Sequence, residues 1–243
     1  MRTRITHAFC IALALALLAG CPKKPANGRT TAKEKPEDVK ARDEVLQDAA
    51  QKRANWSAKL KSMDPAQLAA ELTVESNKGR EPFNSMAFAE AAHRGEATAP
   101  ALAASITNDD RSSLLTLLAV RAASRPAYDS IAPQRRVNIL VDALRTSPTF
   151  NTWGLPHVKW EYAAQALAGE GELAARALEP LLSDKRPAPS WGSEDRMQYE
   201  HYKYRVCDYA WAIIAAIHQQ KVEPSPDPAV RDRIIESTTR QKP

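Results

Sequence analysis

Hydrophobic residues recur every three to four positions along most of the chain, which is the spacing of one face of an α-helix. The clearest stripes are Val137, Leu140, Val141 and Leu144; Trp160, Ala163, Ala164 and Leu167; and Val206, Ala210, Ile213, Ile214 and Ile217. The last stripe is so apolar that we expect its helix to be buried on most sides. No segment alternates apolar and polar residues convincingly, so the pattern predicts an all-α fold.

Helix boundaries are marked at both ends of this pattern. Residues 37–61 are expected to form one long polar helix with few apolar contacts. Asp64 and Pro65 then have the residue types of an N-cap and a first helical position. The proline-rich stretch 223–228 interrupts the chain before a short last helix expected near 229–237.

The N-terminus has the pattern of an export signal. Arg2 and Arg4 precede an apolar run that is shorter than the roughly 20 residues of a transmembrane helix. The run ends in Leu18-Ala19-Gly20-Cys21, which resembles the lipobox of bacterial lipoprotein precursors. The resemblance implies that the Cys21 thiol receives the lipid and that the signal is cut before it. The alternative is an ordinary signal peptide, in which Leu18 fits poorly where a small residue is preferred.

These features divide the chain into four parts. Residues 1–20 are the predicted signal peptide, 21–36 a flexible tether, 37–221 the helical domain, and 222–243 the proline-rich break with its short helix. The lipid would hold the domain at a membrane of the bacterial cell envelope. Pro22, rather than an aspartate, follows the lipidated cysteine, which by family resemblance favours the outer membrane of a Gram-negative cell.

The helical region contains an internal similarity. Residues 88–96 (FAEAAHRGE) are echoed by residues 162–170 (YAAQALAGE), and each copy is followed by a second alanine-rich helix. Such hairpins cannot bury their apolar faces alone and must stack on neighbours. The pattern resembles the HEAT-repeat family, which implies an α-solenoid and a non-catalytic binding surface. An irregular α-helical bundle is the alternative fold.

Charge and cysteine content exclude some functions. Removing residues 1–20 takes away two arginines and leaves 32 basic against 29 acidic residues, interspersed along the chain. We therefore expect a solvated surface and no nucleic-acid partner. Cys10 leaves with the signal and Cys21 carries the lipid, so Cys207 is the remaining thiol, expected to be buried and inert. No cofactor is expected.

A long segment between Asp184 and Tyr204 interrupts the repeat and is the candidate binding loop. Long insertions in solenoids often form the binding face. Aromatic side chains with polar tips suit recognition surfaces. The candidate partner-binding residues are Trp191, Tyr199 and Tyr202, with Trp153 from a second aromatic group at Phe150, Trp153, Trp160 and Tyr162. The alternative is that these aromatics belong to the core, or that Trp191 staples the loop to the body.

Motifs of catalysis and metal binding are missing from the sequence. GxSxG, the P-loop, GxGxxG and HExxH do not occur. The pairs Glu90/His93 and His157/Glu161 lack a third ligand, so no metal site is predicted. The remote alternative is an unfamiliar hydrolase that uses Glu200, His201 and Asp208.

The sequence therefore predicts a non-enzymatic, membrane-anchored scaffold that binds another envelope protein. The alternative is an envelope ligand binder whose aromatic cluster stacks on a sugar or peptide of the wall. An aromatic-lined pocket would favour the small ligand, whereas a broad exposed patch would favour a protein.

Overall fold

The computed structural model describes residues 36–221 and 223–240. The chain divides into two units, residues 1–49 and residues 50–243. The predicted signal peptide, Cys21 and the tether up to residue 35 lie outside the described residues. Within the described ranges, no helix is long and apolar enough to cross a membrane.

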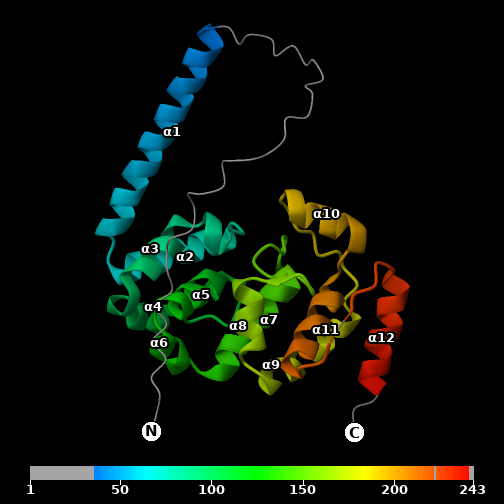
Figure 1. Ribbon diagram of the computed structural model, residues 1–243. Coiled ribbons are helices and arrows are strands. Elements are labelled where there is room, and N and C mark those ends of the chain that lie inside the picture. The colour runs from blue at the N-terminus through cyan, green and yellow to red at the C-terminus, as the bar shows by residue number, and fades with distance from the viewer. Residues whose placement is uncertain (1–35, 222, 241–243) are drawn as a thin grey trace, which may run out of the picture. The chain divides into compact units, whose positions relative to one another are not determined.

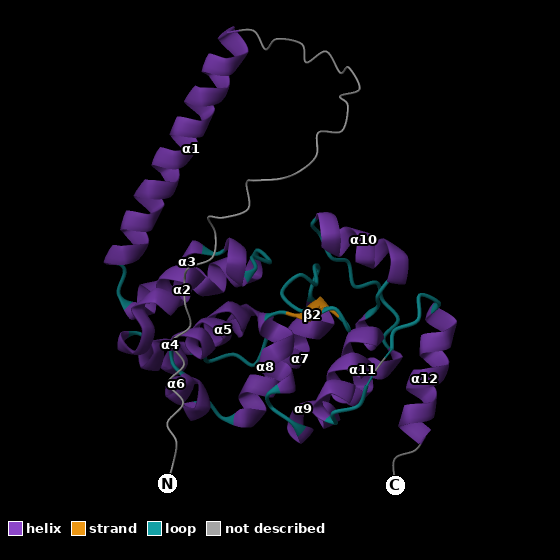
Figure 2. Cartoon of the chain, viewed as in Figure 1, coloured by secondary structure: helices purple, strands orange, loops and turns teal. Residues whose placement is uncertain are grey.

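Helices make up most of the described chain, so the all-α prediction is confirmed (Figures 1 and 2). The α-helices are α1 (Pro36–Ser62), α2 (Pro65–Asn77), α3 (Met86–Arg94), α4 (Ala99–Ser105), α5 (Leu114–Ala123), α6 (Arg125–Ser130), α7 (Pro133–Thr146), α8 (Tyr162–Ala168), α9 (Glu172–Leu178), α10 (Ser193–Tyr202), α11 (Val206–Ile217) and α12 (Pro228–Arg240). Short 3₁₀ helices are η1 (Pro82–Asn84), η2 (Gly95–Ala97), η3 (Arg111–Ser113) and η4 (Glu179–Ser183).

Both ends of α1 and the start of α2 agree with the prediction from the sequence. α1 begins and ends within one residue of the expected 37–61. α2 follows a capping box, in which the Gln67 amide N–H donates to Asp64 Oδ1 at 2.8 Å. The Asp64 amide N–H donates in return to Gln67 Oε1 at 3.0 Å. These two bonds satisfy donors that the start of a helix otherwise leaves open.

The core of residues 50–243 is built around α5, which packs against α2, α3, α4 and α6. Every residue of α5 from Leu114 to Val120 is buried. Beside it, α7 buries Val137, Leu140 and Leu144 as its stripe predicts. A fully buried leucine or valine contributes about 1.5–3 kcal/mol relative to exposure, so this stripe fixes α7 on the core.

The two similar segments form the same local structure. α3 is followed by α4, and α8 by α9, with Leu102 and Leu178 of the second helices fully buried. The matching glycines Gly95 and Gly169 both cap the first helix, but only Gly95 has a positive φ, of 58°. In the second copy the left-handed residue is Gly171, at φ 62°. The turns are therefore similar in position but not in conformation.

A small sheet lies where the sequence indicated only helix. β1 (Gly154–Leu155) pairs antiparallel with β2 (Lys159–Trp160), Gly154 opposite Trp160. Trp160 therefore belongs to a strand, not to the helical stripe in which it was placed, and α8 begins two residues later. The Ala163 amide donates to the Thr152 carbonyl at 3.1 Å, which ties the start of α8 to the preceding loop.

The C-terminal helix α12 is part of the compact unit and longer than the expected 229–237. Ile235 of α12 packs with Cys207 and Trp211 of α11 in a second small cluster. α11 is buried on nearly all sides, as its apolar sequence predicts. Arg231 of α12 is fully buried and forms a bidentate pair with Asp208, at 2.9 and 3.0 Å. The predicted boundary at residue 222 therefore does not separate α12 from the helical domain.

Candidate functional site

The segment between Asp184 and Tyr204 is fixed to the body by backbone hydrogen bonds at several points. The Phe150 amide donates to the Pro189 carbonyl at 2.8 Å, and the Ala188 amide to the Tyr204 carbonyl at 2.9 Å. α10 lies inside this segment and makes up its second half (Figure 1). These hydrogen bonds fix the backbone of the predicted insertion on the rest of the protein.

Asn151 holds the tip of this segment through the backbone of Trp191. Asn151 Oδ1 accepts from the Trp191 amide at 2.9 Å, and Asn151 Nδ2 donates to the Trp191 carbonyl. The Trp191 side chain is 57% exposed. The backbone, and not the indole, therefore fastens the loop, and the indole remains available to a ligand.

Trp191 lines a hollow of about 300 Å³ with a second exposed aromatic residue, Phe83, which is 62% exposed. We call it the aromatic hollow; it is lined by Gly79, Glu81, Phe83, Asn84, Thr149, Asn151, Trp191 and Gly192. Three segments that are far apart in the sequence contribute these residues: the end of α2 with η1, the loop after α7, and the loop before α10. The volume lies at the small end of the range for ligand pockets.

Glu81 is the one charged residue among the described residues that line the aromatic hollow. Its carboxylate accepts from Thr149 Oγ1 at 3.3 Å. Burial raises the pKa of Glu81, and the negative charge of Asp195 adds to the rise, while hydrogen bonds from Thr149 and Asn84 oppose it. The hollow therefore combines two aromatic side chains with a half-buried carboxylate and neutral hydrogen-bonding groups.

Two cations beside the hollow are already engaged. Lys159 Nζ lies 3.0 Å from Asp195 Oδ1, and this pair connects the β1–β2 hairpin to the first turn of α10. Arg111 Nη1 donates to the Thr146 carbonyl at 3.1 Å. Neither side chain is among the residues that line the hollow, and no cation contributes to the shift of the Glu81 pKa.

The other predicted binding residues do not line the aromatic hollow. Trp153 is fully buried, so its indole offers no surface to a partner, and its Nε1 has no hydrogen-bond partner among the described residues. The prediction that Trp153 binds a partner was therefore wrong. The residues next to it in the sequence do not show that it lies in the core. Tyr202 is half-buried and stacks on Tyr204 with ring centroids 5.1 Å apart. Tyr199 is half-buried on α10. Of the predicted residues, only Trp191 lines the hollow.

The weaker chemical candidates are separated by their environments. Asp208 is buried between Arg231 and Arg205, whereas Glu200 is exposed and lies 3.8 Å from Arg196. His201 is also exposed. These three side chains therefore share no surface on which a hydrolase site could form.

The two carboxylate–histidine pairs and Cys207 have other surroundings. Glu90 pairs with Arg94 at 2.9 Å, and His157 lies in the turn between β1 and β2 rather than on a helix with Glu161. No group of three possible ligands occurs among residues 36–221 and 223–240. Cys207 is fully buried, and burial raises the pKa of its thiol to about 12.

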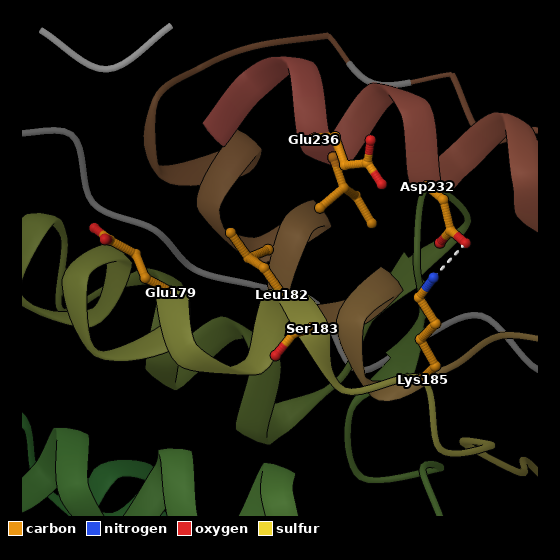
Figure 3. A pocket seen from close by; sticks show the side chains of 7 residues that line it. Glu179, Leu182, Ser183, Lys185, Asp232 and Glu236 are labelled. Carbon is orange, nitrogen blue, oxygen red and sulfur yellow. Dashed lines mark hydrogen bonds and ion pairs between the residues drawn. The ribbon is translucent and has the colours of Figure 1, made fainter. Parts of the chain in front are cut away.

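Another hollow, of about 400 Å³, lies between η4 and α12 (Figure 3). Four of its labelled residues are charged: Glu179, Lys185, Asp232 and Glu236, of which Lys185 and Asp232 point at one another and form a 2.8 Å ion pair. Leu182 and Ile235 supply its apolar surface, and none of its lining residues is aromatic. This hollow therefore offers no aromatic face to a ligand, which distinguishes it from the aromatic hollow.

Comparisons with known proteins found no match: no family model fits the chain, and no curated protein or solved structure resembles it significantly. The likeness to HEAT repeats and to the lipobox therefore rests on the residues quoted above.

Sequence reasoning missed most of the aromatic hollow. Glu81, Phe83, Thr149 and Asn151 were not singled out, because none lies in a helical stripe or a known motif. One local signal was present: Phe83 stands after a proline in a polar stretch, where an apolar side chain has no core to enter. The pairing of this stretch with Trp191 depends on tertiary structure alone.

Proposed function

We propose that this chain is a membrane-anchored protein of the bacterial envelope that binds a saccharide in the aromatic hollow without catalysing a reaction. The observation that carries the proposal is the presence of Phe83 and Trp191, both largely exposed, on one polar-lined hollow. Single exposed aromatic residues are common, but two that line the same hollow form the kind of apolar patch that marks binding sites. Because Phe83 and Trp191 line the same hollow, one ligand could contact both rings.

The polar residues that line the hollow suit the hydroxyl groups of a sugar. Glu81, Asn84 and Thr149 present carboxylate, amide and hydroxyl groups, which accept from and donate to vicinal hydroxyls. The C–H face of a sugar ring packs on an aromatic face while its hydroxyls bond at the edge. A wall peptide bound as an added strand would instead need an open sheet edge, and β1 and β2 contribute nothing to the lining.

The protein-scaffold interpretation keeps one observation in its favour. Val158 and Met197 are 49% and 67% exposed, and the Lys159–Asp195 ion pair connects their two elements. Both lie outside the aromatic hollow, so they would serve a different surface. A defined pocket lined by aromatic residues favours the small ligand over a broad protein interface.

We further infer that the helices stack as a HEAT-like solenoid. The support is that both similar segments fold into helix–turn–helix units, α3 with α4 and α8 with α9, whose second helices bury a leucine at matching places. The aromatic hollow then lies where the long segment 184–204 interrupts the repeat. Insertions at such places often carry the binding site.

The test is a calorimetric titration of the full chain, in detergent micelles, with oligosaccharides that have acetylated or free amino groups. We expect at least one of these ligands to bind, and Trp191→Ala to raise its Kd by about tenfold or more. Met197→Ala is the matched control, because Met197 is as exposed, lies on α10, and does not line the hollow.

Two results would contradict the proposal. One is that no saccharide of the panel binds, and the other is that Trp191→Ala and Met197→Ala leave the affinity equally unchanged. Recovery of one envelope protein by crosslinking, lost in Met197→Ala but kept in Trp191→Ala, would favour the scaffold interpretation instead.

A further inference from the structure

The charge of the aromatic hollow narrows the class of ligand. Glu81 is half-buried, and the neighbouring cations Lys159 and Arg111 are bound to other groups. The donors that reach its carboxylate, Thr149 and Asn84, are neutral. A half-buried carboxylate with only neutral partners is incompletely compensated and favours a cation.

The two aromatic side chains favour the same kind of ligand. The face of an aromatic ring carries negative electrostatic potential, which attracts an ammonium group within about 6 Å of its centroid. Phe83 and Trp191 line the hollow together with Glu81. Proteins commonly bind ammonium groups in sites that combine aromatic rings with a carboxylate.

We infer that the saccharide bound in the aromatic hollow carries a free ammonium group, as an unacetylated amino sugar does, and that Glu81 is its counter-ion between Phe83 and Trp191. The inference rests on the proposed saccharide function and specifies the ligand. An acetylated amino sugar presents a neutral amide at the same position. It would leave the Glu81 charge without a partner, so the site distinguishes the two forms of one sugar.

The titration of Glu81 gives a second signature. Burial, together with the charge of Asp195, raises the pKa of Glu81 in the free protein. A bound ammonium group favours the ionised carboxylate and lowers the pKa again. Binding of the amino sugar therefore releases protons from the protein wherever Glu81 is partly protonated in the free protein, and the observed heat then depends on the ionisation enthalpy of the buffer. In the free protein Lys159 pairs with Asp195, and Arg111 donates to the Thr146 carbonyl.

The experiment compares glucosamine oligomers with N-acetylglucosamine oligomers of the same length, titrated into the full chain near neutral pH. We expect the glucosamine oligomer to bind at least about tenfold more tightly than its acetylated counterpart. Glu81→Gln keeps the shape and one acceptor oxygen but removes the charge, so it should abolish this preference while retaining weak binding of both oligomers. Trp191→Ala should weaken both, and circular dichroism confirms that each variant is folded.

The outcomes separate the inference from the function on which it rests. Equal affinity for the two oligomers, both weakened by Trp191→Ala, would overturn the ammonium inference and leave the saccharide function standing. A preference for glucosamine that persists in Glu81→Gln would also overturn it, because the counter-ion would lie elsewhere. Failure of both oligomers to bind would overturn both proposals. A lysine oligopeptide that binds more tightly than glucosamine, and is lost in Trp191→Ala, would assign the hollow to a peptide.

Discussion

Arg231 is a fully buried cation, and its partners explain why the fold tolerates it. Asp208 receives two of its N–H groups, and the Tyr202 carbonyl receives another at 2.9 Å. Arg205 pairs with the same aspartate at 3.1 Å. The network joins α10, α11 and α12 at one point. Removing one partner of such a pair leaves a buried charge, which costs more than the intact pair contributes.

Replacement of Arg231 by methionine should therefore lower the free energy of unfolding by about 3 kcal/mol or more, measured by urea denaturation. The control is Arg125→Met, which breaks an exposed ion pair with Asp129 and should cost less than about 1 kcal/mol. Equal small effects at Arg231 and Arg125 would show that the buried network contributes little.

His157 makes stability depend on pH. Burial is the main cause that lowers the pKa of His157 to about 4. The negative charge of Asp208 opposes this shift, and the positive charge of Arg231 adds to it. The unfolded chain, with the ordinary histidine pKa of 6.5, then takes up the proton first. The contribution of His157 to the free energy of unfolding should therefore be constant above pH 6.5 and fall as the pH decreases from 6.5 towards about 4.

The check is urea denaturation across this range in the native chain and in His157→Asn. Asparagine tolerates the positive φ of 68° at this position and does not titrate. Glu81, whose pKa is raised, contributes with the opposite sign, so the difference between the two proteins isolates the histidine. A slope that is identical in both proteins would mean that His157 is accessible to protons in the folded state.

Among the secondary-structure elements, the β1–β2 hairpin depends on one glycine. Gly154 has φ +81°, and a Cβ there would lie 2.3 Å from the Lys159 carbonyl oxygen. Gly154→Ala should therefore cost at least about 2 kcal/mol in urea denaturation, because strain and collision act together. Gly171→Ala is the control: its φ is +62°, but a Cβ there meets nothing within 4 Å. A cost at Gly171 equal to that at Gly154 would assign the effect to backbone conformation alone.

The same hairpin shows where local sequence patterns lose their information. The capping residues Asp64 and Pro65 identify the start of α2 because the chemistry of a cap is local. Trp160 fits a helical stripe with Ala163 and Leu167, yet it pairs with Gly154 in a strand. The neighbouring residues do not predict this pairing. It depends on the positive φ of Gly154 and on the hydrogen bond from the Ala163 amide to the Thr152 carbonyl, and both arise only in the folded chain.

Trp153 and Trp191 show that local sequence also does not predict which aromatic residues reach the candidate site. Both tryptophans lie in loops and are followed by a glycine, but one is fully buried and the other 57% exposed. The difference arises from packing: the rings of Phe150 and Tyr209 meet in the core beside the first loop, with centroids 4.9 Å apart, whereas Asn151 fastens only the backbone of the second. Sequence could nominate the binding loop but could not assemble the aromatic hollow.

For the molecule as a whole, the proposed lipid anchor would determine where in the cell the aromatic hollow meets its ligand. The lipobox-like Leu18-Ala19-Gly20-Cys21 lies outside the described residues, and its support is the sequence alone. A lipid on Cys21 would restrict the protein to a membrane surface, where the saccharides of the envelope are concentrated. Anchoring and recognition are then separate properties, carried by different parts of the chain.

Cys21→Ser should therefore move the protein from the membrane fraction to the soluble fraction and abolish incorporation of labelled palmitate, because the hydroxyl does not replace the thiol as the lipid acceptor. The affinity of the purified variant for its saccharide should be unchanged, since the aromatic hollow is built from residues 79–192. Cys207→Ser is the matched control and should leave fractionation unaltered, because that thiol is fully buried in the folded chain. A Cys21→Ser protein that still sediments with membranes would favour an ordinary signal and attachment through another part of the molecule.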